Sequence, residues 1–235
     1  EKVLSLGWAL ERAARLYPDS PALLEGQRRL SYALFNGWAN RLAHAFKAEG
    51  VQHGSVVAVM LENRAELLVI LAALAKLGAV GALINTTQRG QVLSHSLNLV
   101  GPSHFVVGEE LRAAFDEVRG NLNGSTERLY WVADDDTLLD PGQAPEGWNN
   151  LMRQAQGQAS DNLPDTAQVR LKDACFFIYT SGTTGLPKAS IMSHGRWIKA
   201  YGGFGHSGLG LTRDDVLYLT LRSEERRVGK ECRSR

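Results

Sequence analysis

The stretch from Tyr179 to Lys188 combines the residue types that hold a polyphosphate. Its hydroxyl groups can donate hydrogen bonds, its glycines let the backbone turn sharply and present N–H groups, and its lysine carries a compact positive charge. An apolar, β-prone run from residue 174 to 179 precedes it, so we expect the loop at the carboxyl end of a strand, where α/β sheets place ligands. The residues predicted to bind phosphate are Thr180, Ser181, Gly182, Thr183, Thr184, Gly185 and Lys188.

This loop differs from a Walker A loop, which opens directly into a helix at its lysine. Here Leu186 and Pro187 separate the last glycine from Lys188, and the β-prone residues 189–192 follow. The loop is therefore predicted to join two strands, with Ser193 as the N-cap of a later helix. The same features argue against an unrelated phosphate-binding kinase. An ordinary surface loop is the remaining alternative, which the order of hydroxyls, glycines and Pro-Lys disfavours.

At these residues the chain resembles the adenylate-forming (AMP-binding) superfamily, which includes acyl-CoA synthetases, luciferases and nonribosomal-peptide adenylation domains. The resemblance implies that the phosphates of ATP lie in the loop and that Lys188 and the hydroxyls neutralise the departing pyrophosphate. It also implies that a carboxylate attacks the α-phosphate to give an acyl-adenylate, with Mg²⁺ sharing the negative charge. The same resemblance implies CoA as the acceptor of the acyl group.

Flanking segments are similar to the fatty-acid transport protein branch of that superfamily, the very-long-chain acyl-CoA synthetases. The resemblance runs from about residue 5 to about residue 221 and implies a fatty-acid–CoA ligase. An adenylate-forming ligase for another carboxylic acid and a fatty-acid uptake protein at a membrane stay open as alternatives. The segments that carry the likeness are residues 74–80, 82–86, 89–90, 95–97 and 192–197.

The family's later elements do not occur in the sequence: the magnesium-binding glutamate, the ribose-binding aspartate, the hinge and the carboxyl-terminal domain with its catalytic lysine. We therefore expect residues 1–221 to be part of a large N-terminal adenylation domain that is inactive alone. Residues 222–235 depart abruptly from the family pattern and resemble a translated sequencing adapter. A basic nucleic-acid-binding tail is the alternative interpretation of those residues.

Composition indicates a globular protein, with 44% apolar and 22% charged residues among 235 and a net charge of +1. The small net charge gives no reason to expect nucleic-acid binding. Two cysteines form no disulfide framework, and Cys175 lies in an apolar run typical of a core strand. These features suggest a cytoplasmic protein, with peripheral association at the inner face of a membrane as an option.

Helical and strand-like patterns alternate, which predicts an α/β fold with a mostly parallel, doubly wound sheet flanked by helices. The apolar stretch 67–84 is interpreted as a buried helix ending near Gly78 and then a strand, not as a membrane span. Residues 133–168 are predicted to be a surface excursion with one short helix near 148–156. The expected helices are 6–16, 33–48, 63–77, 90–99 and 109–118, and the expected strands are 22–25, 29–32, 55–61, 80–84, 104–107 and 128–132.

Three further features are interpreted as structural. His194 lies close to the loop, but acyl adenylation needs no base because the carboxylate is already ionised, so no residue is assigned a catalytic role. The glycines of residues 203–208 match G-x-G-x-x-G without following a strand, which favours a flexible connection. Trp197 and Tyr201 share one helical face, which predicts core packing, with a ligand pocket as the alternative.

Overall fold

The computed structural model describes residues 4–134, 138–180 and 185–218. Within them a seven-stranded sheet has the order β7-β6-β5-β3-β4-β8-β9, and all neighbouring strands are parallel except β8 and β9. This confirms the predicted mostly parallel, doubly wound α/β fold. Its strands are β3 (Val56–Met60), β4 (Val80–Leu83), β5 (His104–Gly108), β6 (Leu129–Val132), β7 (Asn149–Asn150), β8 (Ala174–Thr180) and β9 (Lys188–Ser193).

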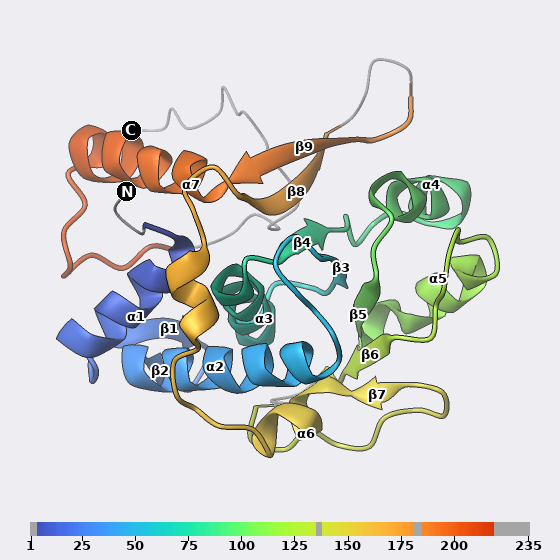
Figure 1. The fold of residues 1–235 in the computed structure, drawn as a ribbon, viewed down its shortest axis with the longest axis horizontal. Coiled ribbons are helices and arrows are strands. Elements are labelled where there is room, and N and C mark those ends of the chain that lie inside the picture. Colours follow the sequence, from blue (N-terminus) through green and yellow to red (C-terminus); the bar gives the residue numbers. More distant parts are fainter. Residues whose placement is uncertain (1–3, 135–137, 181–184, 219–235) are drawn as a thin grey trace.

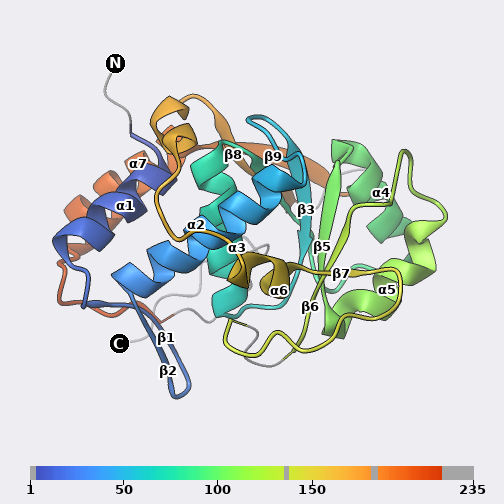
Figure 2. The ribbon, with the colours of Figure 1, turned by 60° about the horizontal axis from the view of Figure 1, so that its bottom comes forward.

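Helices cover both faces of this sheet (Figures 1 and 2). One layer holds α1, α2 and α3, which contact one another, and the opposite layer holds α4 and α5. Chain order alternates strand and helix through the central strands, which produces this double-sided arrangement. The helices are α1 (Leu6–Leu16), α2 (Tyr32–Ala48), α3 (Ala65–Leu77), α4 (Gly90–Val100), α5 (Glu109–Arg119), α6 (Leu151–Gln156) and α7 (His194–Ala200).

The apolar stretch predicted to be a buried helix and a strand forms α3 and β4, with almost every side chain of both buried. Gly78 ends α3 in the left-handed conformation, with φ 68°. A Cβ atom at Gly78 would lie 2.4 Å from His53 Cδ2, so this position requires glycine for space as well as for φ. Across the described part of the chain, no helix combines the length and apolarity that a membrane crossing requires.

The predicted strands 22–25 and 29–32 are present as β1 (Pro21–Glu25) and β2 (Arg28–Ser31), which pair as an antiparallel hairpin in a separate two-stranded sheet. Helix α1 has the predicted bounds, and Ser5 caps it by accepting a hydrogen bond from the Trp8 N–H. Cys175 is fully buried, as expected of a core strand.

The segment 133–168 is not the surface excursion that its composition suggested. Its predicted short helix is present as α6, but β7 extends the sheet beside β6, and a 3-10 helix, η1 (Pro164–Gln168), follows. Several of its apolar side chains are buried in the core beside α2 and α3. These are Leu138, Leu151, Met152, Ala155 and Leu163.

Two interpretations near the end of the described chain are corrected as well. The glycine-containing residues predicted to be a flexible connection form a π-helix, η2 (Tyr201–Gly208), that continues α7. Trp197 packs against Phe176 with ring centroids 6.0 Å apart, as the core prediction required. Tyr201 is 65% exposed, because η2 extends past the sheet, so the core prediction is wrong for this residue.

Candidate functional site

The predicted phosphate loop connects β8 to β9, as the sequence indicated. The two strands are antiparallel, and Thr180 pairs with Lys188 at the end of the hairpin next to the connecting loop. Strand β8 is parallel to β4, so the loop leaves the sheet at the edge where the parallel strands end. Ser181, Gly182, Thr183 and Thr184 lie outside the described residues, whereas Thr180, Gly185 and Lys188 lie within them.

The three described members of the loop are all exposed to solvent. Gly185 has φ 86°, a conformation that side-chain-bearing residues rarely adopt, and this explains the need for glycine there. Within the described residues the ammonium of Lys188 makes no ion pair. A lysine and a threonine, both exposed, therefore occupy paired positions on the two strands next to the loop.

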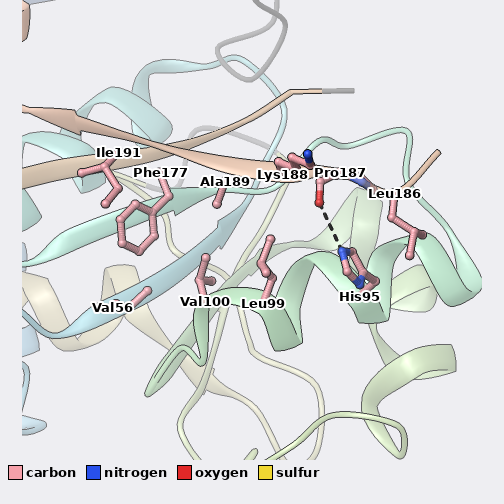
Figure 3. Close-up of a pocket in the computed structure, with 10 residues that line it drawn as sticks. All are labelled: Val56, His95, Leu99, Val100, Phe177, Leu186, Pro187, Lys188, Ala189 and Ile191. Carbon is pink, nitrogen blue, oxygen red and sulfur yellow. Dashed lines mark hydrogen bonds between the residues drawn. The ribbon is translucent and has the colours of Figure 1, made fainter. Parts of the chain in front are cut away.

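Helix α4 packs beneath the hairpin and contacts both of its strands. The Tyr179 O–H donates a buried hydrogen bond of 2.8 Å to the Ser96 carbonyl oxygen. One residue earlier on α4, His95 Nε2 lies 3.2 Å from the Pro187 carbonyl oxygen. Figure 3 shows the second of these contacts, with the imidazole ring pointing up from α4 toward Pro187.

An open groove of about 630 Å³ lies between α4 and the hairpin. Lys188 and His95 lie toward one end of it, while apolar side chains line the rest (Figure 3). The groove therefore combines an apolar wall with a polar end next to the phosphate loop. Its lining residues are Val56, His95, Leu99, Val100, Phe177, Leu186, Pro187, Lys188, Ala189 and Ile191.

His194 has the structural role that the sequence favoured. It is fully buried as the first residue of α7, and its Nδ1 accepts a hydrogen bond of 3.2 Å from the Leu6 N–H. Burial lowers the pKa of His194 to about 4, a shift that the Asp173 carboxylate only partly opposes. The ring is therefore neutral near pH 7 and joins the end of the hairpin to α1. Ser193 caps α7, as predicted, by accepting from the Arg196 N–H.

A polar cluster at the carboxyl ends of β3, β5 and β6 was not identified from the sequence. The Arg28 guanidinium donates at 2.6 Å to the fully buried carboxylate of Glu66. Arg64 lies 3.6 Å from both Glu110 and Asp134, and burial raises the pKa of Glu110. Arg64 and Glu66 follow directly after a buried strand in the sequence, and that spacing is the signal that could have indicated the cluster.

Metal-ligating residues do not gather anywhere in the described part of the chain. No group of three histidine, cysteine, aspartate or glutamate side chains there could hold a metal ion. The candidate site in the described residues therefore consists of Thr180, Gly185 and Lys188, which the β8–β9 hairpin and helix α4 position.

The fold and the loop define a doubly wound α/β domain whose sheet ends in an antiparallel hairpin carrying a hydroxyl- and glycine-rich turn. The family model described as AMP-binding enzyme matches residues 10–222. The chain belongs to the AMP-binding enzyme family.

The proteins similar to this chain include two curated relatives and one solved structure. A medium/long-chain-fatty-acid–CoA ligase of Mycobacterium tuberculosis is 36% identical over 217 residues, which are 92% of this chain and 34% of the relative. Long-chain fatty acid transport protein 1 of Mus musculus is 34% identical over 220 residues, covering 90% of this chain and 32% of the relative. The chain thus spans about a third of the length of these relatives.

The solved structure is an anthranilate CoA ligase in complex with anthranoyl-AMP. It superposes with a TM-score of 0.78 at 24% identity, covering 88% of this chain and 38% of that one. At this identity the match supports the fold alone. The two curated relatives are named as a fatty-acid–CoA ligase and a long-chain fatty acid transport protein.

Proposed function

We propose that the chain carries the phosphate-binding part of the active site of a long- or very-long-chain fatty-acid–CoA ligase. In the proposed reaction a fatty-acid carboxylate attacks the α-phosphate of ATP to give an acyl-adenylate and pyrophosphate. The CoA thiol then takes the acyl group and AMP leaves. The observation that carries the proposal is the hairpin loop that ends in Lys188, in a chain of the AMP-binding enzyme family.

The exposed residues at the loop end of the β8–β9 hairpin are suited to bind the triphosphate of ATP. Lys188 supplies a positive charge for phosphate oxygens, and the Thr180 hydroxyl can donate a hydrogen bond beside it. The φ of Gly185 turns the backbone without a side chain that would block a phosphate. We propose the same role for Ser181, Gly182, Thr183 and Thr184, which lie outside the described residues.

These groups would act through positioning and electrostatics. As pyrophosphate leaves, negative charge grows on oxygens that a fixed ammonium and fixed hydroxyls can stabilise without rearrangement. Mg²⁺ would enter together with the phosphates, which share its coordination with water and one or two carboxylates, and would neutralise part of the phosphate charge. We propose no catalytic base, because the carboxylate is ionised at neutral pH.

Substitution of Lys188 in a full-length protein that carries this chain tests the proposal. Lys188→Ala should lower fatty-acid-dependent ATP–pyrophosphate exchange by about 100-fold to 1000-fold, the usual cost of one oxyanion-stabilising donor. Lys172→Ala, at another exposed lysine near β8, is the matched control and should retain activity. ATP–pyrophosphate exchange that does not require a fatty acid would contradict the proposed function. Exchange at the wild-type rate in Lys188→Ala would contradict it as well.

Fatty-acid uptake is a second candidate function, because several relatives are named long-chain fatty acid transport proteins. Uptake that survives Lys188→Ala in cells, while acyl-CoA formation is lost, would favour this function over ligase activity. An adenylate-forming ligase for another carboxylic acid would instead show exchange with an aryl, amino or bile acid and none with fatty acids.

We further propose that residues 1–221 are part of an adenylation domain that lacks activity alone, and that residues 222–235 are not native. The end of the family match at residue 222 supports this boundary. Fatty-acid-dependent exchange by residues 1–221 alone would contradict the first point, and genomic DNA that continues across the junction would contradict the second. A cytoplasmic protein peripherally bound at the inner face of a membrane fits a fatty-acid substrate.

A further inference from the structure

Two consecutive residues of α4 hold the two stems of the hairpin that carries the phosphate loop. The Ser96 carbonyl accepts from the Tyr179 O–H at 2.8 Å, immediately before the loop begins. His95 Nε2 contacts the Pro187 carbonyl at 3.2 Å, immediately before Lys188. Because 83 and 92 residues separate these partners along the chain, the contacts connect distant segments.

The contact at His95 has a defined chemistry. A carbonyl oxygen only accepts hydrogen bonds, so His95 Nε2 must carry the proton and donate it. Both the neutral Nε2–H tautomer and the imidazolium can do so. The hydrogen bond therefore persists whether His95 is charged or neutral.

The Pro187 carbonyl is an effective point at which to hold Lys188. That carbonyl and the Lys188 N–H belong to one planar peptide unit, so fixing the oxygen fixes the plane from which Lys188 starts. The pyrrolidine ring also fixes φ of Pro187 near −65°, so rotation about the N–Cα bond that precedes this peptide unit is restricted as well. The direction of the lysine side chain then depends on little besides its own rotamers.

Helix α4 is rigid enough to serve as the support. Leu93 and Leu97 are buried against the sheet, with 0% and 1% of their surface exposed, and Tyr179 is buried in the same core cluster. Moving α4 relative to the hairpin would disturb this packing. His95 and Leu99, one turn apart, lie on the flank of α4 that lines the groove under β9 (Figure 3).

We propose that His95 is a positioning residue for the phosphate loop, holding Pro187 so that the Lys188 ammonium meets the phosphates of ATP. This inference rests on the proposed function and deepens it. His95 does not touch substrate in this account; it acts through the backbone at Pro187.

Three variants of His95 in the full-length protein separate positioning from mere packing. In His95→Gln the side-chain Nε2 can reach the carbonyl and donate as the imidazole does. In His95→Asn the amide is too short, and in His95→Leu no donor remains. Gln91→Ala, at an exposed position one turn earlier on α4, is the matched control for altering the surface of this helix.

We expect kcat of fatty-acid-dependent ATP–pyrophosphate exchange to fall about 10-fold to 100-fold in the Asn and Leu variants, the range for a misplaced catalytic group. His95→Gln should restore kcat to near the wild-type value, and KM for the fatty acid should stay unchanged in all three. Wild-type kcat in the Asn and Leu variants, or an equal loss in the Gln variant, overturns the proposal.

Hydrogen–deuterium exchange of the same full-length proteins provides a readout that needs no catalysis. The amides of residue 186 and residues 188–193 should exchange faster in the Asn and Leu variants than in the wild type and the Gln variant. Unchanged exchange, or faster exchange without any loss of kcat, overturns the positioning role. If the wild type has no ATP–pyrophosphate exchange activity, the proposed function fails together with this role, and the amide data then show separately whether the contact exists.

Discussion

His194 makes the stability of this chain depend on pH in a way that can be calculated. Its Nδ1 accepts from the Leu6 N–H, so the folded state needs a neutral ring with the proton on Nε2. Burial lowers its pKa from 6.5 to about 4. Protonation would turn Nδ1 into a donor facing another donor, inside a fully buried site.

The direction of the effect follows from this lowered pKa. As the pH falls below 6.5, the unfolded chain takes up a proton at His194 before the folded chain does. Stability is therefore complete above pH 6.5, falls toward pH 4, and stops changing below it. Linkage between these two pKa values gives a loss of about 2–3 kcal/mol between pH 7.5 and pH 4.5.

Other titrating groups pack around this residue or act in the same range. The neighbouring Asp173 carboxyl has a pKa below its usual 3.8, so its contribution is lost mainly below pH 4. His53 contacts Asp173 at 3.0 Å and remains in every variant. Burial also lowers the pKa of His104, which adds to the loss in the same window. The difference between the wild type and a His194 variant therefore isolates the contribution of His194.

Urea unfolding of the chain at pH 7.5 and pH 4.5 measures that difference. His194→Asn keeps an acceptor near the position of Nδ1 but cannot titrate, so its free energy of unfolding should fall by about 2–3 kcal/mol less than that of the wild type over this range. His206→Asn, at an exposed histidine of η2, controls for removal of an imidazole and should behave as the wild type. An equal loss in the wild type and His194→Asn would refute the reasoning.

Two further changes test the packing that positions the site. Gly78→Ala should lower the free energy of unfolding more than Gly54→Ala does. Both glycines have positive φ, but only at Gly78 would the added Cβ lie within 4 Å of His53. We expect about 1 kcal/mol for Gly54→Ala and about 1–3 kcal/mol more for Gly78→Ala, measured by urea unfolding; equal costs would contradict the close approach. In the wild type the fully buried Lys76 ammonium lies 2.7 Å from the Glu11 carboxylate. Glu11→Gln removes this counter-charge and should lower the free energy of unfolding by about 1–3 kcal/mol. Lys76→Met should cost less than Glu11→Gln in the same assay, and the reverse order would show that the ion pair is not what the buried lysine requires.

Much of the fold could be predicted because local signals agreed with tertiary structure. The apolar run before Thr180 and the proline before Lys188 together predicted a hairpin and excluded a helix. Gly78 and Ser193 indicated a helix end and a helix start, and the structure confirms both. At each of these places one residue type performs a role that few others can.

The missed elements lack such local signals. Strand β7 consists of Asn149 and Asn150, which join β6 through the backbone and carry no β-prone side chains. The glycines of η2 indicated flexibility, yet backbone hydrogen bonding forms a π-helix there.

Long-range contacts were equally invisible in the sequence. The contact between His95 and Pro187 joins residues 92 apart, and the pairing of Arg28 with Glu66 joins residues 38 apart. The pattern of apolar and polar residues in a short stretch of sequence does not reveal such partners, because only the folded chain brings them together. The hairpin that carries the predicted phosphate loop could therefore be predicted from the sequence, whereas its contacts with α4 could not.

A crystal structure of the full-length protein with a non-hydrolysable ATP analogue tests the central claim most directly. We predict that the phosphates lie against the loop that joins β8 to β9, with Lys188 Nζ about 3 Å from a phosphate oxygen. A nucleotide bound elsewhere, with Lys188 directed into solvent, would contradict it.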